Sequence, residues 1–483
     1  MEPAKFMFFV SCAFNFFCIS IGEEGPLTLL VSFDGFRWDY VNKVETPNFD
    51  QLIADGAFVP DGIVNTFITK TFPNHFTLAT GMWEESHGIV ANNMYDPLLN
   101  EHFHIGDEDA KDGKWWDTGA EPIWVTNQLQ GGRSGVYYWP GSESEIKGIR
   151  PNHYKNYSTD TPFSDRVDGV LEWFTGEDPV DVGLLYFNEP DHSGHVYGPD
   201  APEMLNVIRM CDDTAGYLIK RLKEENLYDK INVIITSDHG MAELDMKKRV
   251  IVLENYINLD LFEVVDDTPV AAIRPFDNKN IVTIYNALHD KHPNLTVYLK
   301  EDIPEKFHYQ KNSRIMPIIL VADEGWSIAS TKAEYMNSTQ HGGHGYDNRY
   351  KSMHPFFIAH GPAFKSNFTS KPFNNVDVYP LICHIMGLQP GPNNGSLNVV
   401  NDMLIASVIP VVPAFFPYHL KLSQRLIIAI IFAGSIALIA AILLTGMCVR
   451  QRKYRLKNYR PDLPATNYEG SKPLLSEQDE DIA

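Results

Sequence analysis

Cysteine, basic residues and internal repeats are all scarce in this chain of 483 residues. Five cysteines are too few for a disulfide framework. The 40 lysines and arginines are outnumbered by 62 acidic residues, which gives a formal net charge of -22. Because phosphate backbones repel such a chain, its charge argues against a protein that coats nucleic-acid polymers. The charge does not exclude a small anionic substrate that is held by a bound metal ion.

Only two cysteines lie outside the apolar segments near the ends of the chain, and they define no disulfide pattern. Cys211 and Cys383 can pair with each other, but Cys211 also follows Ile208 and precedes Ala215 at helical spacing. A cysteine in such a pattern commonly behaves as a small apolar residue. We therefore predict that Cys211 is a buried free thiol on a helix.

Each end of the chain carries an apolar run, and the two runs have different predicted roles. Residues 6–21 are mostly apolar, and Glu23 and Glu24 end the run, so residues 1–23 are predicted to be a secretory signal peptide. Leu426–Val449 holds 24 residues without a charge. As a helix this run spans about 36 Å, which is enough to cross the hydrocarbon core of a bilayer. It is therefore predicted to be a transmembrane helix.

Basic residues from Arg450 to Arg460 follow this run and predict the orientation of the chain. Positive charge next to a membrane helix stays on the cytoplasmic side, so residues 450–483 form a predicted cytoplasmic tail. Residues 406–425 are the predicted stalk, and residues 24–405 the main domain, outside the cell. We expect a single-pass type I protein at the cell surface, with shedding or secretion as an alternative. Asn-X-Ser/Thr triplets predict N-glycosylation at Asn156, Asn294, Asn337, Asn367 and Asn394.

Three apolar runs of strand length predict the centre of the fold. Leu27–Phe33, Val182–Phe187 and Ile231–Thr236 are almost continuously apolar, as strands that are covered on both faces are. Between the last two lies Pro202–Leu227, where apolar residues recur at helical spacing. Strand, helix and strand in this order predict an α/β domain with a largely parallel sheet.

Carboxylate and imidazole side chains follow each of these predicted strands. Asp34 follows the first, Asp191 and His195 follow the second, and Asp238 and His239 follow the third. A single aspartate at such a place is usually only part of a turn or a helix cap. Because ligands bind beyond the carboxyl ends of the strands in open α/β sheets, three such ends together indicate one shared site. Aspartate and histidine are good zinc ligands, so the sequence predicts a zinc site there.

Two further segments supply what such a site still needs. A glycine-rich loop holds His341 and His344, and on spacing alone either can be a further zinc ligand or an idle surface histidine. Thr71 precedes Pro73 at the predicted opening of a helix, where a phosphate group also prefers to bind. A threonine hydroxyl becomes a nucleophile once a metal ion or a base takes its proton. Without the metal ligands Thr71 would be only a helix cap.

Together these segments resemble the ectonucleotide pyrophosphatase/phosphodiesterase family of the alkaline phosphatase superfamily. The motifs that carry the resemblance are Ser32 to Arg37, Lys70 to His75, Pro190 to His195, Ser237 to Met241 and His344 to Asn348. The resemblance covers roughly residues 25–400, and the short membrane-anchored members 4 and 5 look most similar. It implies an alkaline-phosphatase-like α/β fold whose central, mostly parallel sheet is flanked by helices and followed by one C-terminal transmembrane helix.

The resemblance also implies a role for each site residue. Two zinc ions per chain are expected, one held by Asp34, Thr71, Asp238 and His239 and the other by Asp191, His195 and His344. The resemblance thereby selects His344 over His341. Thr71 would be the nucleophile and Asn92 a donor to a phosphate oxygen, and the nucleotide site would be lined by Phe72, Tyr157 and Tyr186. Glu143 stands where relatives have aspartate, which bears on the choice of base.

The activity implied is extracellular, zinc-dependent hydrolysis of phosphodiester or pyrophosphate bonds in small nucleotides or dinucleotides. Thr71 would form a covalent ester with the nucleotide, and water would then release a nucleoside 5'-monophosphate. A choline-phospholipid phosphodiesterase and a phosphomonoesterase or sulfatase of the same superfamily are alternatives, although Thr71 cannot become the formylglycine of a sulfatase. A catalytically silent ectodomain for adhesion or signalling would be expected to lack a ligand or the nucleophile, and this chain has all of them.

Overall fold

The computed structural model describes residues 25–336, 338–406 and 422–457. The chain divides into two compact units, Met1–His419 and Leu420–Ala483. The predicted signal peptide, most of the predicted stalk and the tail beyond residue 457 fall outside the described residues, as does Asn337. The boundaries of the predicted segments therefore stay predictions.

Three parallel strands form the centre of the main sheet and coincide with the three predicted runs. They are β1 (Leu27–Phe33), β7 (Val182–Phe187) and β8 (Ile231–Thr236). β1 lies between the other two and pairs in parallel with both. Nearly every residue of the three strands is buried, which explains why each one reads as a continuous apolar run.

Five more strands extend this sheet. They are β2 (Ala57–Phe58), β5 (Ser134–Tyr137), β6 (His153–Lys155), β17 (Phe357–His360) and β18 (Phe368–Thr369). The strand order is β18-β2-β17-β8-β1-β7-β5-β6. β17 runs antiparallel to β8 and β2, whereas the other pairs of neighbours are parallel. The sheet is therefore mixed and mostly parallel, as predicted.

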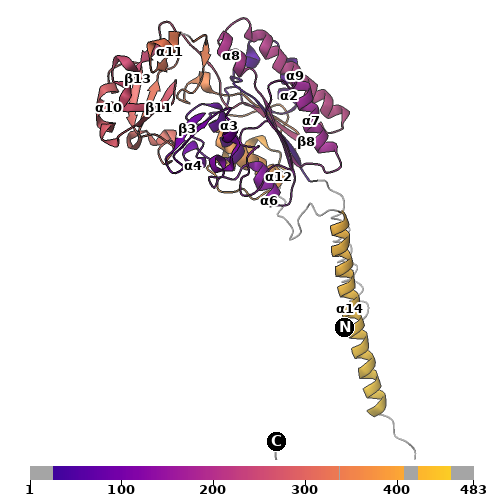
Figure 1. Ribbon diagram of the computed structural model, residues 1–483. Helices are drawn as coiled ribbons and strands as arrows, with labels where there is room; N and C mark the ends of the chain where they lie inside the picture. The colour runs from indigo at the N-terminus through magenta and orange to yellow at the C-terminus, as the bar shows by residue number, and fades with distance from the viewer. Residues whose placement is uncertain (1–24, 337, 407–421, 458–483) are drawn as a thin grey trace, which may run out of the picture. The chain divides into compact units, whose positions relative to one another are not determined.

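Helices cover both faces of the main sheet (Figure 1). Side chains alternate between the faces along a strand, so Leu29 and Val31 of β1 join one buried cluster and Leu30 joins another. The helices that contribute to the first cluster are α2 (Pro47–Asp55), α7 (Phe163–Thr175) and α9 (Met204–Glu224). Those that contribute to the second are α3 (Thr71–Thr80), α6 (Ile123–Leu129) and α12 (Val378–Met386). These three layers confirm the predicted alkaline-phosphatase-like α/β fold.

Both cysteines of the main domain are buried free thiols. Cys211 lies on α9, which corresponds to the predicted helix Pro202–Leu227, and Cys383 lies on α12. Because the two helices contribute to clusters on opposite faces of the sheet, the thiols do not pair. The prediction of a buried free thiol at Cys211 is confirmed.

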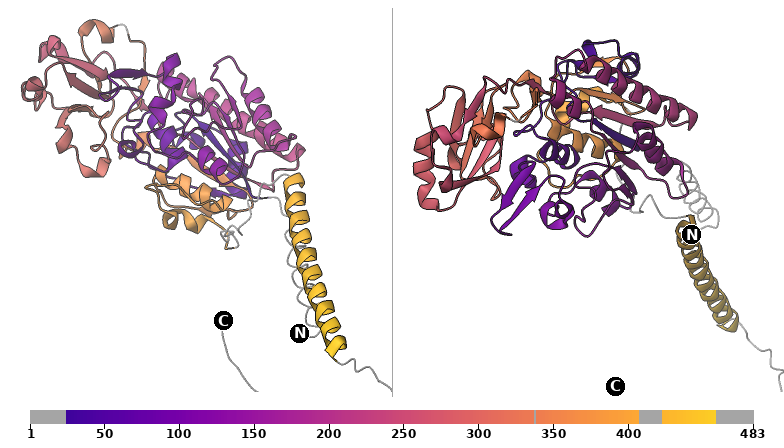
Figure 2. Two further views of the ribbon diagram at one scale, coloured as in Figure 1. Left: turned by 60° about the horizontal axis from the view of Figure 1, so that its bottom comes forward. Right: turned by 45° about the horizontal axis from the view of Figure 1, so that its top comes forward.

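A second, antiparallel sheet forms a smaller lobe that the sequence analysis did not predict. Its strands are β11 (Phe262–Asp266), β12 (Val270–Pro275), β13 (Leu295–Leu299) and β14 (Ile318–Ala322), in the order β11-β12-β14-β13. The helix α10 (Ile281–Leu288) shares a separate buried cluster with this sheet. Figure 2 shows the lobe at one end of the domain. Some residues of β11 and β13 are partly exposed, so their apolar pattern is weaker than that of β1.

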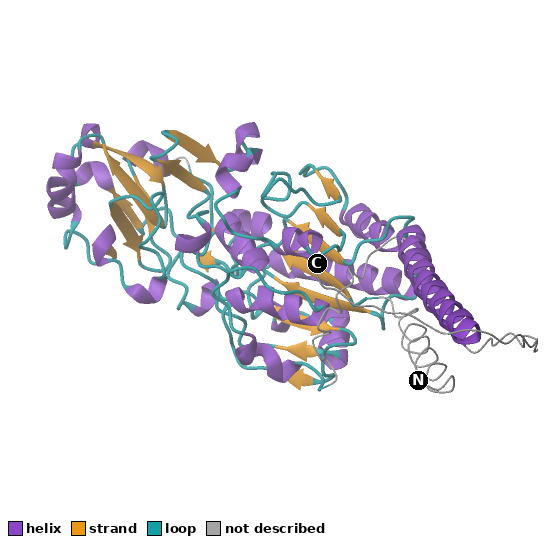
Figure 3. Cartoon of the chain, turned by 90° about the horizontal axis from the view of Figure 1, so that it is seen from below, coloured by secondary structure: helices purple, strands orange, loops and turns teal. Residues whose placement is uncertain are grey.

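The other strands and α-helices described for the main domain are short and lie around the two sheets (Figure 3). Three small antiparallel or parallel pairs are β3 (Asn93–Asp96) with β4 (Glu101–His104), β9 (Ala242–Glu243) with β16 (Gly342–Gly343), and β10 (Val250–Val252) with β15 (Ser327–Ala329). The short helices are α4 (Glu84–His87), α5 (Gly113–Trp116), α8 (Asp191–Tyr197), α11 (Lys332–Met336) and α13 (Leu397–Val400).

The second unit holds one long helix, α14 (Leu422–Lys457). Its stretch Ala433–Lys453 has 21 residues and a mean hydropathy of 1.9, so by length and composition it is a candidate membrane span. This stretch overlaps the predicted transmembrane run Leu426–Val449.

Candidate active site

The carboxyl ends of β1, β7 and β8 bring the predicted acidic residues together. Asp34 follows β1, Asp191 opens α8 beyond β7, and Asp238 follows β8. The backbone N–H of Asp191 donates to the carbonyl oxygen of Asp34 at 2.9 Å, and that of Gly35 donates to Oδ1 of Asp238 at 3.2 Å. Gly35 has a φ of +69°, and a Cβ at this position would lie 2.8 Å from the Cβ of Asp191. Glycine therefore permits the close approach of the strand ends.

Three histidines beside these carboxylates are oriented by the same kind of contact. Nδ1 of each ring lies 2.8–2.9 Å from a backbone carbonyl oxygen, and the pairs are His195 with Gly342, His239 with Gly240 and His344 with Thr69. A carbonyl oxygen can only accept a hydrogen bond, so in the neutral ring Nδ1 carries the proton and Nε2 a lone pair. This arrangement is typical of histidines that bind a metal through Nε2.

The Nε2 atoms of these rings face the carboxylates. Nε2 of His195 and Nε2 of His344 lie 3.4 and 3.5 Å from Oδ1 of Asp191. Nε2 of His239 lies 3.0 Å from Oδ2 of Asp238, and the ring stacks on that of His344 at 3.5 Å. Burial lowers the pKa of His239 and the neighbouring Asp238 raises it, with a net upward shift. The carboxylates therefore favour a positive charge where the Nε2 atoms converge, and a metal cation provides one.

Three carboxylate oxygens of this cluster have no hydrogen-bond donor among the described residues. They are Oδ1 of Asp34, Oδ1 of Asp191 and Oδ2 of Asp238. Burial, followed by repulsion from Asp238 and Asp191, raises the pKa of Asp34 well above its ordinary value. Buried carboxylates without partners are costly unless a cation neutralises them. The donor set thus fits a metal site rather than an ordinary hydrogen-bond network.

The atoms that face one another form three overlapping groups, each within 4.8 Å. One group, Asp191 with His195 and His344, matches a predicted zinc site. The others are Asp34 with Asp238 and His75, and Asp34 with Asp191 and His239. The fold thus gathers all six Asp and His residues predicted as ligands, while their binding of zinc stays a prediction. His341 is exposed and contributes its backbone N–H to the carbonyl oxygen of His195 at 2.8 Å.

His75 is a residue of this cluster that the sequence analysis did not single out. Its Nδ1 lies 2.9 Å from the carbonyl oxygen of Thr71 and 3.3 Å from Oδ2 of Asp238, and its Nε2 lies 2.8 Å from Oγ of Ser32. The carbonyl contact indicates that Nδ1 carries a proton, so His75 suits a support for Asp238 better than a metal ligand. The residue stands one helical turn after Thr71 in a motif already noted, which is the signal that could have identified it.

Thr71 opens α3 beside the same cluster. Its Oγ1 lies 3.3 Å from Nε2 of His239, and the residue is buried. Lys70, the residue before it, is extended and caps the helix. The first amides of a helix have no intrahelical acceptor and form its positive end. A hydroxyl group, a helix N-terminus and the Asp/His cluster therefore meet at one place.

Asn92 is tied to the residue after Thr71. The backbone N–H of Phe72 donates to Oδ1 of Asn92 at 3.0 Å. This contact fixes the side-chain amide with its oxygen towards Phe72, so that the Nδ2 group is the end that can donate elsewhere. The Phe72 ring packs on Trp116 at 5.7 Å and on Phe103 at 6.0 Å.

The two tyrosines predicted to line a nucleotide site have different environments. Tyr157 is 44% exposed, and its ring contacts those of Tyr138 at 5.2 Å and Tyr186 at 6.1 Å. Tyr186 is buried, and its hydroxyl donates to Oδ2 of Asp34 at 2.6 Å. Glu143, at the position where relatives have aspartate, accepts the backbone N–H of Tyr157 at 3.0 Å. Its carboxylate therefore supports the chain that carries Tyr157.

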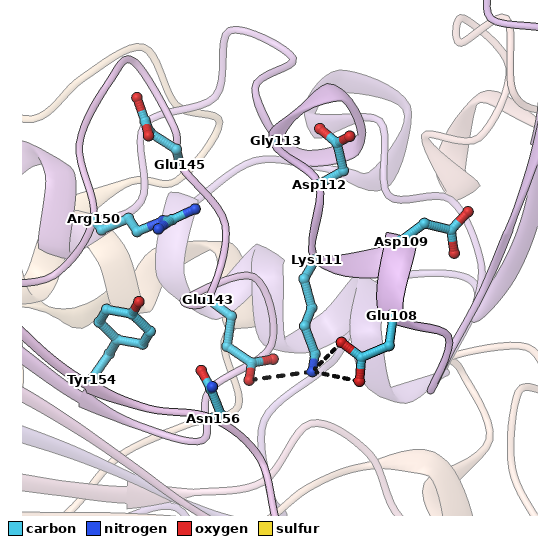
Figure 4. Close-up of a pocket in the computed structure, with 10 residues that line it drawn as sticks. All are labelled: Glu108, Asp109, Lys111, Asp112, Gly113, Glu143, Glu145, Arg150, Tyr154 and Asn156. Atoms are coloured by element: carbon cyan, nitrogen blue, oxygen red, sulfur yellow. Dashed lines mark hydrogen bonds and ion pairs between the residues drawn. The ribbon is translucent and has the colours of Figure 1, made fainter.

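A cavity of about 640 Å³ lies on the other side of this segment. Figure 4 shows Lys111 between Glu108 and Glu143, with ion-pair distances of 3.3 and 3.9 Å. Most charged residues of the lining are acidic, namely Glu108, Asp109, Asp112, Glu143 and Glu145 against Lys111 and Arg150. Such a lining repels phosphate. Of the predicted site residues, only the sequon residue Asn156 lines this cavity.

Comparison with known proteins places this architecture in a family. The sequence pattern of type I phosphodiesterase/nucleotide pyrophosphatase matches residues 28–347. The chain belongs to the type I phosphodiesterase/nucleotide pyrophosphatase family. It is 48% identical over 394 residues to ectonucleotide pyrophosphatase/phosphodiesterase family member 5 of Homo sapiens, covering 82% of this chain and 81% of the relative. It is 47% identical over 389 residues to bis(5'-adenosyl)-triphosphatase enpp4 of Mus musculus, covering 80% and 83%.

Solved structures of relatives share the fold. An inactive threonine-to-alanine variant of murine ectonucleotide pyrophosphatase/phosphodiesterase 5, in complex with AMP, superimposes with a TM-score of 0.76 at 48% identity and covers 79% of this chain and 100% of that chain. The human protein of the same name gives a TM-score of 0.76 and covers 78% of this chain and 99% of that chain. The predicted family and the predicted enzyme class, a nucleotide pyrophosphatase/phosphodiesterase, are confirmed.

The described sequon residues differ in how well they can accept a glycan. Asn156, Asn367 and Asn394 are exposed. Asn294 is partly buried, and its Nδ2, the atom that would carry a glycan, donates to Asp323 at 3.0 Å. Glycosylation stays a prediction at all five positions and is favoured by exposure at the first three.

Proposed function

We propose that this protein is an extracellular, zinc-dependent hydrolase of phosphodiester or pyrophosphate bonds in nucleotides or dinucleotides that releases a nucleoside 5'-monophosphate. Family membership supports the reaction class. A relative at 47% identity is named bis(5'-adenosyl)-triphosphatase, which supports a dinucleotide substrate. The AMP complex of a relative supports a nucleoside 5'-monophosphate as the product.

The observation that carries the proposal is the position of the Thr71 hydroxyl. Its Oγ1 lies at the start of α3 and 3.3 Å from Nε2 of His239, beside buried carboxylates that have no partner. A threonine hydroxyl is a poor nucleophile in water and needs such surroundings to lose its proton. That a threonine-to-alanine variant of a relative is called inactive supports a catalytic threonine.

Two zinc ions per chain fit the donor set of the cluster. We assign Asp34, Thr71, Asp238 and His239 to one ion and Asp191, His195 and His344 to the other, in keeping with the Nδ1–carbonyl contacts that present Nε2 as the donor atom. Bound zinc would act as a Lewis acid that lowers the pKa of the hydroxyl and offsets phosphate charge. His75 and Tyr186 would hold the carboxylates of Asp238 and Asp34 in place.

The chain's own residues then carry the reaction in two steps. The Oγ1 atom of Thr71 attacks phosphorus as the bond to the leaving oxygen breaks, which leaves the nucleotide esterified to the enzyme. Water subsequently cleaves this ester and restores the hydroxyl. Asn92, whose Oδ1 accepts the N–H of Phe72, directs Nδ2 to a non-bridging phosphate oxygen. The exposed ring of Tyr157 and the ring of Phe72 provide surfaces on which a base can stack.

A substrate panel tests this proposal directly. We expect the full-length protein in detergent to hydrolyse diadenosine triphosphate, ATP or NAD, to lose activity on chelation and to regain it with zinc. Thr71→Ser should keep part of the activity and Thr71→Ala should lose it. Activity that is restricted to glycerophosphocholine would favour the choline-phospholipid alternative. Full turnover after exhaustive metal removal, or by Thr71→Ala, would contradict the proposal.

We further propose a type I topology at the cell surface. α14 contains the candidate span Ala433–Lys453, and basic residues follow from Arg450. Protease added to intact cells should therefore digest the main domain and spare an epitope tag placed after residue 483. Protection of the main domain in surface-labelled protein would reverse the orientation.

A further inference from the structure

The smaller lobe contacts the main domain close to the nucleophile. β11, an edge strand of the lobe, lies against β3, which begins directly after Asn92. Glu263 of β11 pairs with His102 of β4 at 3.2 Å. Near its end β11 has an irregularity in its pairing with β12, between Val264 and Asp266. Such bulges redirect side chains, and here the redirected residue is Asp266.

The Asp266 carboxylate links two segments that are distant in sequence. Its Oδ2 pairs with Nζ of Lys70 at 2.5 Å, and its Oδ1 accepts from Nδ2 of Asn93 at 3.1 Å. The side chains of Asp266 and Lys70 are 1% and 7% exposed. Both partners are direct neighbours of active-site residues, since Lys70 precedes Thr71 and Asn93 follows Asn92.

A third contact closes the connection. The N–H of Phe72 donates to Oδ1 of Asn92 at 3.0 Å, so the nucleophile segment and the Asn92 segment are joined on both sides of the reacting groups. Replacing a buried ion pair by apolar residues is often neutral for stability or increases it, so fold stability alone does not explain why a lysine and an aspartate are placed there. Their placement next to the two reacting side chains does.

We infer that Asp266 is a positioning residue, which sets the distance and orientation between the Thr71 hydroxyl and the Asn92 amide through Lys70 and Asn93. The inference rests on the proposed function, because it assigns Asp266 to the same reaction. Asp266 acts on the transition state through its neighbours and touches neither the substrate base nor the Asp/His cluster in the contacts above. Its loss should therefore lower kcat and leave substrate affinity and metal content largely unchanged.

The test compares three variants of the full-length protein with the wild type. Asp266→Asn keeps an acceptor for Asn93 but removes the charge opposite Lys70. The matched control Glu263→Gln changes a carboxylate on the same strand that pairs with His102 and Arg274, away from Thr71 and Asn92. The double variant Lys70→Met/Asp266→Asn also removes the buried lysine charge and so restores stability that the single variant loses.

We expect kcat of Asp266→Asn to fall by up to about 100-fold, because a misplacement of about 1 Å can cost that much. KM and zinc content should stay within about threefold, and the loss should be equal for diadenosine triphosphate and for a diester without a base. The double variant should regain thermal stability but not kcat, and Glu263→Gln should keep wild-type kcat. An unchanged kcat in Asp266→Asn, or a kcat that recovers with stability in the double variant, would overturn the inference while the active wild type upholds the proposed function. A wild-type protein without phosphodiesterase activity would overturn both.

Discussion

The hydroxyl of Tyr186 donates to Oδ2 of Asp34 at 2.6 Å, although the resemblance to the family had suggested Tyr186 as part of the nucleotide site. The tyrosine is buried and its ring also contacts that of Tyr157 at 6.1 Å. A hydrogen bond to a ligand carboxylate fixes the orientation in which it meets a metal ion. Tyr186 therefore connects the metal cluster to the surface on which a base would stack.

Tyr186→Phe should consequently weaken zinc retention. The ring is kept, so stacking is little changed, but Asp34 loses its donor, and partners of this kind are worth roughly 10- to 100-fold in metal affinity or activity. Competition with a chelator of known affinity measures the change. Tyr138→Phe is the matched control, because its hydroxyl contacts Thr161 at 2.8 Å and not the cluster. Equal zinc retention in the two variants would leave Tyr186 only a place in the pocket.

The two histidines of the glycine-rich loop should differ sharply. His344 presents Nε2 to Asp191 at 3.5 Å, whereas His341 is exposed. His344→Ala should lose close to one zinc per chain and most activity, and His341→Ala should retain both. Metal analysis of the purified variants decides between them. The reverse order would assign the ligand to His341.

Removal of metal should destabilise the main domain. The unpartnered oxygens of Asp34, Asp191 and Asp238 repel one another when no cation is bound. Zinc at about 100 times its dissociation constant should add about 2.7 kcal/mol per site, seen as a rise of several degrees in Tm. In the metal-free protein, Asp34→Asn should raise Tm because it removes one of the repelling charges. A Tm that does not respond to zinc would argue against a metal site.

Base recognition can be separated from bond cleavage at Tyr157. Loss of one stacking surface costs about 2 kcal/mol, which corresponds to roughly thirtyfold in affinity. Tyr157→Ala should therefore weaken diadenosine triphosphate strongly and barely affect a phosphonate ester without a base. The ratio of kcat/KM for the two substrates is the measurement. An unchanged ratio would remove the nucleotide pocket from the account and favour the choline-phospholipid alternative.

The centre of the fold was predictable because its strands are buried on both faces. β1, β7 and β8 match the predicted runs residue for residue, and polar residues at their ends showed where the site lies. The smaller lobe was not predicted, because exposed positions interrupt strands such as β11 and β13. Some contacts of the site also join residues that no local pattern relates. Asp266 lies 196 positions from Lys70, and Tyr186 lies 152 positions from Asp34.

Mass spectrometry of Thr71 after a rapid acid quench tests the central claim most directly. Trypsin cleaves after Lys70 and next after Lys111, so the peptide 71–111 begins at the proposed nucleophile. During turnover of a dinucleotide we predict a nucleotidyl group on Thr71 in this peptide, which forms and decays at rates compatible with kcat and is absent from Thr71→Ala. Turnover by Thr71→Ala at the wild-type rate, or an adduct on another residue that forms and decays at those rates, would contradict the account.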